Sequence, residues 1–333
     1  MAQPYILSIG DIFSDAFIKL NEDVVRIEVD SDGQKRMSLP LGTKPPYDDV
    51  EIVKGVGPGP NAAVAIARLG LRSGLVSFIG DDQVGEEALE YLQSEQVEKD
   101  LVSVQPGLKT SYYYVLRYGA ERTILVKNEN FNYTWTDPLE EPAWIYLALM
   151  SEGSWQFHED LLAYLHEHPS VKLAFQPGTF HFKWGVEKLA GLYRRSHIIV
   201  LNREEAVDIT GRSYDSIKDL AIGLHDFGPQ KVVITDGPNG SYASYDFKLV
   251  TIPNYPDAAL PVDRTGAGDA FASTIVAALA DGETMETALT WAPINSASVV
   301  QRIGAQAGLL NREQIAQYIT EAPEWYRLTE YDG

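Results

Sequence analysis

Asp263-Arg264-Thr265-Gly266-Ala267-Gly268-Asp269-Ala270-Phe271 is the stretch that decides how this chain folds and where its chemistry lies. Its small residues allow a sharp backbone turn and a close approach by a ligand. They lead directly into an apolar run, Ala270–Ala280, which predicts a long buried helix. Free N–H groups and the positive dipole end make a helix N-terminus an anion site. The stretch therefore predicts a bound anion with a carboxylate, Asp269, beside it.

A carboxylate next to an anion site suits phosphoryl transfer to a hydroxyl group. The N–H donors stabilise charge on the moving phosphoryl group, while Asp269 takes the proton from the attacking hydroxyl. The spacing alone also permits a structural interpretation, in which Asp269 caps the helix and the glycines pack against a strand. Spacing by itself does not separate these two interpretations.

Strand-like and helix-like runs alternate through most of the 333 residues. The strand-like runs are nearly continuous in apolar residues, which is typical of strands buried on both faces of a parallel sheet. They are Tyr5–Ile9, Leu75–Ile79, Trp144–Leu149, Lys172–Gln176, Ile198–Leu201 and Lys231–Thr235. Amphipathic helical patterns lie between them, at Asn61–Leu69, Gly85–Gln96, Trp155–His166, Val186–Arg195 and Tyr214–Phe227. This alternation predicts a three-layer α/β/α fold with a mostly parallel central sheet.

Two regions interrupt the alternation. Residues 17–50 and 110–127 alternate polar and apolar side chains around turns, which is typical of half-exposed antiparallel strands. We expect a small β-sheet lid, with strands at approximately 17–50 and 108–130, inserted in a single domain of residues 1–333. Exposed strand edges tend to be covered, so the lid predicts a homodimer.

Composition excludes several classes of function. The formal net charge of −20 argues against nucleic acid as a partner. No run approaches the roughly 20 apolar residues of a membrane span, and the N-terminus lacks the positive region of a signal peptide, so we expect a cytoplasmic protein without membrane contact. The chain has no cysteine, which excludes disulfides and thiolate chemistry. His158, His166 and His168 lie on one polar stretch, where we expect them to be solvated and not to bind metal.

The pattern Asp-x-Thr-Gly-Ala-Gly-Asp-Ala-Phe at 263–271 resembles the C-terminal signature of the ribokinase-like (PfkB) carbohydrate kinases. Further matches follow in the family's order, over about residues 5 to 310. They are Ile9-Gly10-Asp11 with Asp15, Gly57–Asn61 with the helix after it, Phe78–Asp82 with Gly85, Asn202–Glu205, and Thr235–Gly240. So many ordered matches favour the catalytic interpretation of Asp269.

The resemblance implies an ATP-dependent kinase that phosphorylates a hydroxyl of a small ribose-, fructose- or ketodeoxysugar-like molecule, with Mg²⁺-ATP as the donor. Asp269 would be the general base, and Gly266, Ala267 and Gly268 would form the anion hole. The residues implied to bind the sugar are Asp15, Gly57 and Asn61. Those implied to bind ATP are Asn202, Thr235, Gly237, Gly240 and Asn295. Glu205 would hold Mg²⁺ through water, and Asp263 matches a monovalent-cation site that some members use for K⁺.

Plainer interpretations exist for several of these residues. Asn202 and Glu205 have the spacing of a helix-capping pair, and Asn61 is placed to cap the helix that it begins. The lid arginines Arg117 and Arg122 either close over a ligand or are solvated. The chain has no Gly-x-x-x-x-Gly-Lys-Ser/Thr motif, so it is not a P-loop kinase.

The acceptor is left open by the sequence. The family usually has two adjacent glycines where this chain has Val56-Gly57, and the nearby prolines stiffen the loop, so we expect a differently shaped pocket. A nucleoside kinase of the same family is the alternative, which a base-stacking role for Tyr112–Tyr114 would favour. A non-catalytic sugar-binding regulatory homologue is a third, although it would be expected to lose Asp269 or the anion hole first.

Overall fold

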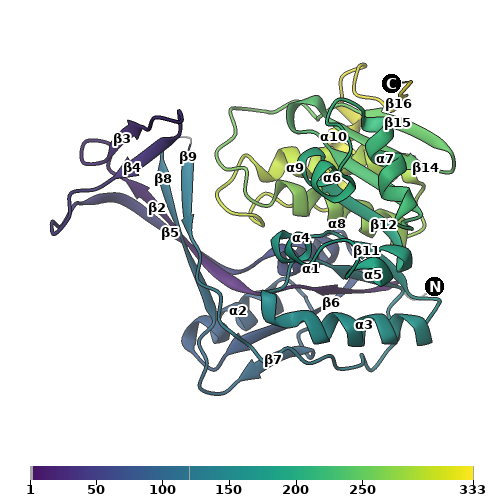
Figure 1. Ribbon diagram of the computed structural model, residues 1–333, viewed down its shortest axis with the longest axis horizontal. Coiled ribbons are helices and arrows are strands. Elements are labelled where there is room, and N and C mark those ends of the chain that lie inside the picture. The colour runs from purple at the N-terminus through teal and green to yellow at the C-terminus, as the bar shows by residue number, and fades with distance from the viewer. Residues whose placement is uncertain (1–2, 120, 333) are drawn as a thin grey trace.

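A ten-stranded sheet runs through the middle of the computed structural model, which describes residues 3–119 and 121–332 (Figure 1). Every neighbouring pair from β13 to β7 is parallel, whereas β14, β15 and β16 extend one edge in antiparallel fashion. The order across the sheet is β16 (Thr329–Glu330), β15 (Lys248–Ile252), β14 (Ser241–Tyr245), β13 (Lys231–Thr235), β12 (Ser196–Asn202), β11 (Lys172–Phe175), β10 (Trp144–Leu147), β1 (Tyr5–Ile9), β6 (Arg72–Gly80) and β7 (Val102–Gln105). The predicted α/β fold with a mostly parallel sheet is confirmed.

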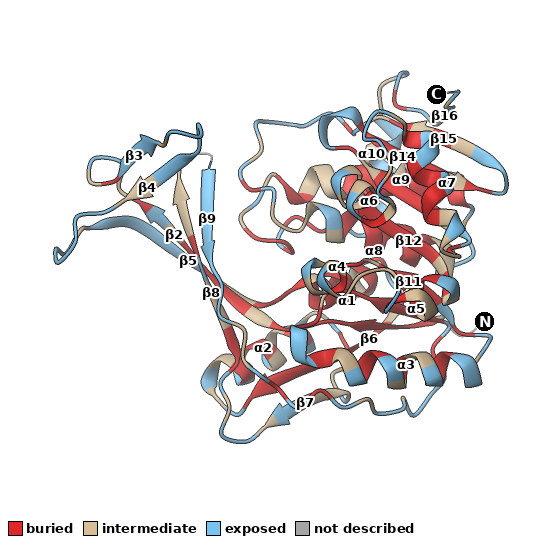
Figure 2. Cartoon of the chain, in the orientation of Figure 1, coloured by how far each residue is buried: buried red, intermediate tan, exposed pale blue. Residues whose placement is uncertain are grey.

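Alternate residues of each strand enter separate cores, because successive side chains of a strand point to opposite faces. Ile6 packs in one core and Leu7 in the other, and Ile198 and Ile199 divide in the same way. Helices α1 (Pro58–Arg68), α8 (Ala267–Ala280), α9 (Met285–Val299) and α10 (Arg312–Thr320) contribute to the first core. Helices α3 (Trp155–Glu167), α5 (Ala190–Arg195), α6 (Arg203–Thr210) and α7 (Ile217–Asp226) contribute to the second. Figure 2 shows the buried side chains concentrated along the sheet and the inner helix faces.

A four-stranded sheet projects away from this body, where the lid was predicted (Figure 1). Its order is β5 (Tyr47–Val56), β2 (Phe13–Leu20), β8 (Ser111–Tyr118) and β9 (Glu121–Leu125). The expectation of antiparallel strands was wrong for its central pair, since β2 and β8 are parallel. Both strands continue from parallel strands of the main sheet, β1 and β7, and so leave it in the same direction. The hairpin of β3 (Arg26–Val29) and β4 (Lys35–Ser38) forms a sheet of its own.

Two helices of the chain differ from the sequence pattern. The helix expected at 186–195 occupies only α5, and a short helix that was not predicted, α4 (Thr179–Trp184), precedes it. Gly185 separates the two, with a positive φ of 79° that glycine adopts without strain. The remaining helix, α2 (Gln83–Ser94), packs beside α1. No helix within the described ranges has both the length and the apolar character to cross a membrane.

His158, which was expected to be solvated, is buried against His181 of α4. His158 Nδ1 lies 2.7 Å from the Ser154 carbonyl oxygen, which can only accept, so Nδ1 carries the proton. The Gly178 N–H donates to His181 Nδ1, so His181 donates from Nε2 to His158 Nε2 across 2.9 Å. Both rings are therefore neutral, and together they join the start of α3 to the start of α4. Burial lowers the pKa of His158 to about 4 and that of His181 well below its ordinary value.

We expect this pair to make stability depend on pH. Below pH 6.5 an unfolded chain takes up protons that the folded one excludes, because the pKa of His158 is about 4. The stabilisation is therefore complete above pH 6.5 and is lost as the pH falls toward 4, by up to about 1.4 kcal/mol per pH unit for each histidine. The His158→Asn variant lacks one of these two titrations. The difference between its Tm and that of wild type should therefore become smaller as the pH falls from about 7.5 to about 5.5. His166→Asn, on the exposed side of the same helix, is the control, and a difference for His158→Asn that does not change with pH would contradict the assignment.

Candidate active site

The N-terminus of α8 lies at the carboxyl ends of the central strands, and its glycines serve different purposes. Gly266 precedes the helix with a φ of 77°, and a Cβ there would lie 2.2 Å from the Cβ of Ala305. Only glycine satisfies both constraints. A Cβ on Gly268 would have open space, with Gln176 Nε2 as its nearest neighbour at 3.9 Å. The missing side chain at Gly268 therefore leaves room for a ligand beside the free N–H groups of the first turn.

Asp269 lies in that first turn with its carboxylate held by two amides. Its Oδ2 accepts a hydrogen bond from Asn61 Nδ2 at 2.7 Å, and its Oδ1 accepts one from Gln176 Nε2 at 3.1 Å. Burial raises the pKa of Asp269 above its ordinary value, and the two hydrogen bonds oppose that rise. Asp269 thus does not cap α8, whose N-cap is Gly266.

Asn61 lies inside α1, not at its start as expected. The N-cap of α1 is Gly57, and the Asn61 N–H donates to the Gly57 carbonyl oxygen at 2.7 Å. The Asn61 side chain reaches Asp269, and its Oδ1 accepts from Gln306 Nε2 at 2.8 Å. An amide fixed at its oxygen presents its NH₂ group to the carboxylate.

Asp15 lies within the lid strand β2, on the face that turns toward the body of the protein. Its side chain is buried, and Oδ1 has no hydrogen-bond partner. Burial and the neighbouring Asp263 raise the pKa of Asp15 to about 7, while Arg122 opposes the shift. A buried carboxylate oxygen without a donor is unfavourable, so this position suits a ligand that brings hydroxyl donors.

Asp263 is surrounded by donors from three segments. Its Oδ1 accepts from the Thr265 N–H at 3.1 Å, from Thr265 Oγ1 at 2.8 Å and from Arg122 Nη1 at 3.0 Å. Its Oδ2 accepts from the Gly304 N–H at 3.1 Å. Arg122 is a lid arginine, so the lid is tied to the loop before α8 by an ion pair in which Asp263 is buried. Of the two alternatives for this arginine, solvation is thus the wrong one.

A cavity of about 480 Å³ lies beside the N-terminus of α8. Among the residues that line it are Thr235, Gly237, Gly240, Arg264, Ala267 and Gly268. The structure therefore brings the residues implied to bind nucleotide from β13 and its turn next to the residues implied to form the anion hole. Pro293, Ser296 and Ala297 of α9 close another side of the cavity.

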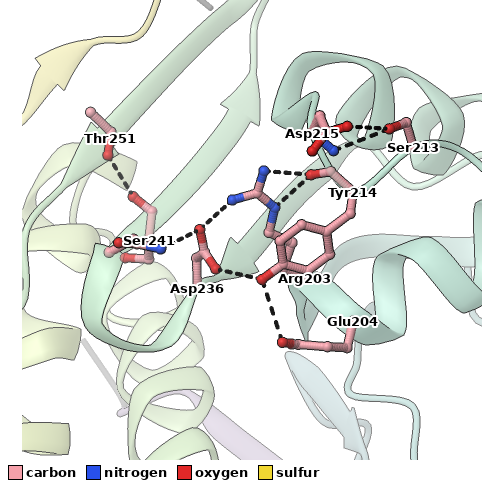
Figure 3. Close-up of polar contacts among 9 residues, drawn as sticks. Arg203, Glu204, Ser213, Tyr214, Asp215, Asp236, Ser241 and Thr251 are labelled. Atoms are coloured by element: carbon pink, nitrogen blue, oxygen red, sulfur yellow. Dashed lines mark hydrogen bonds and ion pairs between the residues drawn. The ribbon is translucent and has the colours of Figure 1, made fainter.

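The turn that borders this cavity is fixed by a buried ion pair, drawn in Figure 3. Arg203 Nη1 donates to Asp236 Oδ2 at 2.6 Å, and its Nε donates to the Tyr214 carbonyl oxygen at 2.9 Å. The guanidinium group also lies over the Tyr214 ring, 4.2 Å from its centre. Asp236 begins the short helix η2 (Gly237–Asn239), so Arg203 holds the cavity wall against α6.

Three further predicted residues lie away from the cavity wall. Asn202 and Glu205 form a capping box at the start of α6, in which the Asn202 N–H donates to Glu205 Oε2 at 2.9 Å. Asn295 was expected to face ATP, but it is fully buried between α8 and its neighbours. Its Nδ2 donates to Thr274 Oγ1 at 2.8 Å, and its Oδ1 accepts from the Leu310 N–H at 2.9 Å. Both ends of that amide are satisfied within the protein, which corrects the prediction.

Sequence reasoning missed Gln176, the second donor to Asp269. Its position just after β11 was a usable signal, because ligands of open α/β sheets bind at the carboxyl ends of strands. Within the described ranges, no group of three or more His, Asp or Glu side chains is placed to hold a metal ion.

Comparison with known families agrees with this arrangement. The chain matches the model of the pfkB family carbohydrate kinases over residues 49–312. It belongs to the pfkB family of carbohydrate kinases. The kinase is 27% identical to a ribokinase of Bacillus subtilis over 269 residues, which is 79% of this chain and 87% of that protein.

Solved structures agree on the fold of the kinase. An Arabidopsis thaliana ribokinase complexed with ribose and ATP superposes with a TM-score of 0.77 at 19% identity, covering 96% of this chain and 99% of that one. An E. coli protein in complex with ATP and Mg²⁺ also gives a TM-score of 0.77, at 18% identity, covering 96% of this chain and 100% of that one.

The glycine that the kinase retains in its N-terminal signature is required by its backbone. Gly57 has a φ of 131°, and a Cβ there would lie 2.1 Å from the carbonyl oxygen of Asp11. Pro58 and Pro60, expected to stiffen the loop, lie in the first turn of α1, where proline is tolerated. Val56, which stands where the family usually has the first of two adjacent glycines, is buried.

Arg122→Ala tests whether the ion pair holds the lid. A hydrogen bond between charged groups contributes roughly 1.5–3 kcal/mol, so its loss should raise hydrogen exchange about tenfold or more in β8, β9 and residues 262–266. Arg117→Ala is the matched control, because Arg117 lies directly opposite Arg122 in the same hairpin and Asp263 bonds to Arg122. Equal exchange in the two variants would show that the ion pair does not restrain the lid.

Proposed function

We propose that this kinase transfers the γ-phosphoryl group of ATP to a hydroxyl of a small sugar, with Asp269 as the general base. The observation that carries the proposal is the position of Asp269. It is a half-buried carboxylate, held by two N–H donors, in the first turn of a helix that borders a cavity. Such a group can accept the proton of a hydroxyl while the helix end stabilises the transferred phosphoryl group.

The two substrates would approach Asp269 from opposite sides. We place ATP in the cavity, against Thr235, Gly237 and Gly240, with its phosphates toward Gly268. The sugar would lie on the lid side, where the unpartnered oxygen of Asp15 can accept from its hydroxyls. Closure of the lid over this space would exclude water that otherwise hydrolyses ATP.

Magnesium fits this site as part of the nucleotide complex. Mg²⁺ is commonly bound through one or two carboxylates together with substrate phosphates and water. Glu205 uses Oε2 for the capping box and leaves its other oxygen for a metal-bound water, while Asn202 lies directly opposite Thr235 in the sheet. When bound, Mg²⁺ would neutralise charge on the phosphates.

A requirement for K⁺ is less well supported by Asp263. Both of its oxygens accept protein hydrogen bonds, and one of the donors is the guanidinium cation of Arg122. A monovalent cation coordinated there would compete with that arginine. We therefore infer that activity does not depend on K⁺.

We further propose that the kinase dimerises through the outer face of its lid. Ile52, Tyr114 and Leu125 lie in one row across that face, with Ala16 of β2 between Ile52 and Tyr114, and Ile52 is 53% exposed. Exposed apolar side chains grouped in this way mark protein contact surfaces.

Asp269→Asn tests the catalytic assignment. The amide keeps the size of the side chain but cannot take up the proton, so kcat should fall by about 10²–10⁴-fold with ATP binding and Tm nearly unchanged. Asp281→Asn, at the other end of the same helix, should retain wild-type activity. An Asp269→Asn variant with activity near wild type would refute the assignment.

The acceptor is identified in the same assay. ADP release should be followed with ribose, fructose, 2-keto-3-deoxygluconate, adenosine, cytidine and inosine, each with K⁺ and with Na⁺. We expect a sugar to give the highest kcat/KM in either salt. Preference for a nucleoside would favour the alternative acceptor class, and saturable binding of a sugar without ADP release would favour a regulatory protein.

Ile52→Lys tests the dimer. A charge in a buried apolar contact is strongly unfavourable, so the variant should sediment as a monomer at concentrations where wild type is a dimer. Val29→Lys is the matched control, since Val29 is 65% exposed on the separate β3–β4 hairpin. If wild type sediments as a monomer, or if Ile52→Lys stays dimeric, the outer lid face is not the interface.

A further inference from the structure

The carboxylate of Asp269 is held by two amides that are themselves held. Asn61 donates to Oδ2 and has its own oxygen fixed by Gln306 Nε2 at 2.8 Å. Gln176 donates to Oδ1 and has its own oxygen fixed by the hydroxyl of Tyr146. The arrangement is thus matched on both sides of the carboxylate, although the two amides come from distant parts of the chain.

The orientation of Gln176 matters because an amide has two unlike ends. Its NH₂ group stabilises a carboxylate, whereas its oxygen would repel one. An ionised Asp269 can only accept, so it takes the NH₂ group, and the phenol hydroxyl of Tyr146 then donates to the oxygen at the other end of the amide. The backbone of Gln176 is also fixed, because its N–H donates to the Leu147 carbonyl oxygen at 2.9 Å.

Tyr146 is itself immobile. It lies in β10, fully buried in the core that packs beneath α8, and its strand neighbour in β11 is Ala174. Burial, reinforced by the charge of Asp269, raises the pKa of Tyr146 well above its ordinary value. The hydroxyl therefore stays protonated and remains a donor throughout the range in which the kinase would work.

We propose that Gln176 is a positioning residue that keeps Asp269 ionised and correctly oriented, and that Tyr146 acts through Gln176 by preventing its amide from turning over. The inference rests on the proposed role of Asp269 as the base. Loss of Gln176 leaves a half-buried carboxylate with one donor in place of two, and loss of Tyr146 leaves the Gln176 amide free to turn. Protonation of Asp269 then becomes easier, and a protonated carboxyl group cannot accept the proton of a hydroxyl.

Few other charges complicate this arrangement. The pKa of Asp269 is set by burial and by its hydrogen bonds to Asn61 and Gln176. The charge of Asp269 in turn raises the pKa of Tyr146. Asp15 and Asp263, on the lid side, act on each other and on Arg122. A change at Gln176 should therefore be expressed in the titration of Asp269.

The first measurement is the pH profile of kcat/KM, with ATP and the sugar of the panel that is phosphorylated fastest. We expect the acid limb to move up by about one pH unit in Gln176→Leu and by a smaller amount in Tyr146→Phe. Because Tyr146 acts through Gln176, the double variant should match Gln176→Leu alone. Tyr326→Phe, which removes another buried hydroxyl bonded to a carbonyl oxygen, should leave the profile unchanged.

A second measurement needs no activity. Raising the pKa of a buried carboxyl group lowers stability where that group is ionised, so the effect is absent at low pH and grows as the pH rises. The Tm deficit of Gln176→Leu should therefore narrow as the pH falls through the titration of Asp269, and it should not depend on pH in an Asp269→Asn background.

The outcomes separate this inference from the proposed function. An acid limb that does not move in a folded Gln176→Leu variant, or shifts of Tyr146→Phe and Gln176→Leu that add, would overturn the inference alone. An Asp269→Asn variant that keeps its activity would overturn the base and this inference together. Tyr146→Phe retains the shape of the core, so it decides the matter even where Gln176→Leu fails to fold.

Discussion

A single constraint, a half-buried carboxylate stabilised by donors from the protein, explains why the site of this kinase is built from such distant segments. Asp269 needs donors from within the protein, and they come from α1 and from the end of β11. The side-chain oxygen of each donor amide accepts a hydrogen bond in turn. Gln306 donates to Asn61, and Tyr146 donates to Gln176, from two further segments of the chain. The site therefore exists only where α8, α1 and the parallel strands are packed together. Local geometry at the site is thus a consequence of the global fold.

The same logic resolves how a chain with a net charge of −20 can accept a polyanion. Two acidic residues near the cavity are paired with arginines, Asp236 with Arg203 and Asp263 with Arg122. Both acids are buried, so their pairing acts at short range in a low dielectric and is screened little by salt. The lining of the cavity includes the end of α8 and two charged residues of opposite sign, Arg264 and Asp257. Overall charge is therefore a poor guide to the local field, although it remains informative about partners such as nucleic acid.

Sequence predicted those features that depend on short-range pattern. The turn at Gly266, the helix behind it and the apolar strands follow from residues a few positions apart, and all are confirmed. The misses depend on packing between remote elements. Asn295 is of a residue type that can bind a ligand. Its hydrogen-bond partners, on α8 and near α10, are determined by how the helices pack against each other. His158 lies on a polar stretch of the sequence, but in the fold it is buried and hydrogen-bonds to His181. Gln176 was the last residue of a predicted strand and was not recognised as a site residue.

The lid connects the two halves of the site through charge. Asp15 and Arg122 both belong to its strands, and both lie close to Asp263 of the loop that precedes α8. Burial raises the pKa of Asp15 to about 7, and the negative charge of Asp263 adds to the rise while Arg122 opposes it. A ligand that donates hydroxyl hydrogens to Asp15 would favour its ionised form and so strengthen its attraction to Arg122. An ionised Asp15 also repels Asp263 of the loop, so Arg122, which pairs with Asp263, is the group that holds the lid against the loop before α8.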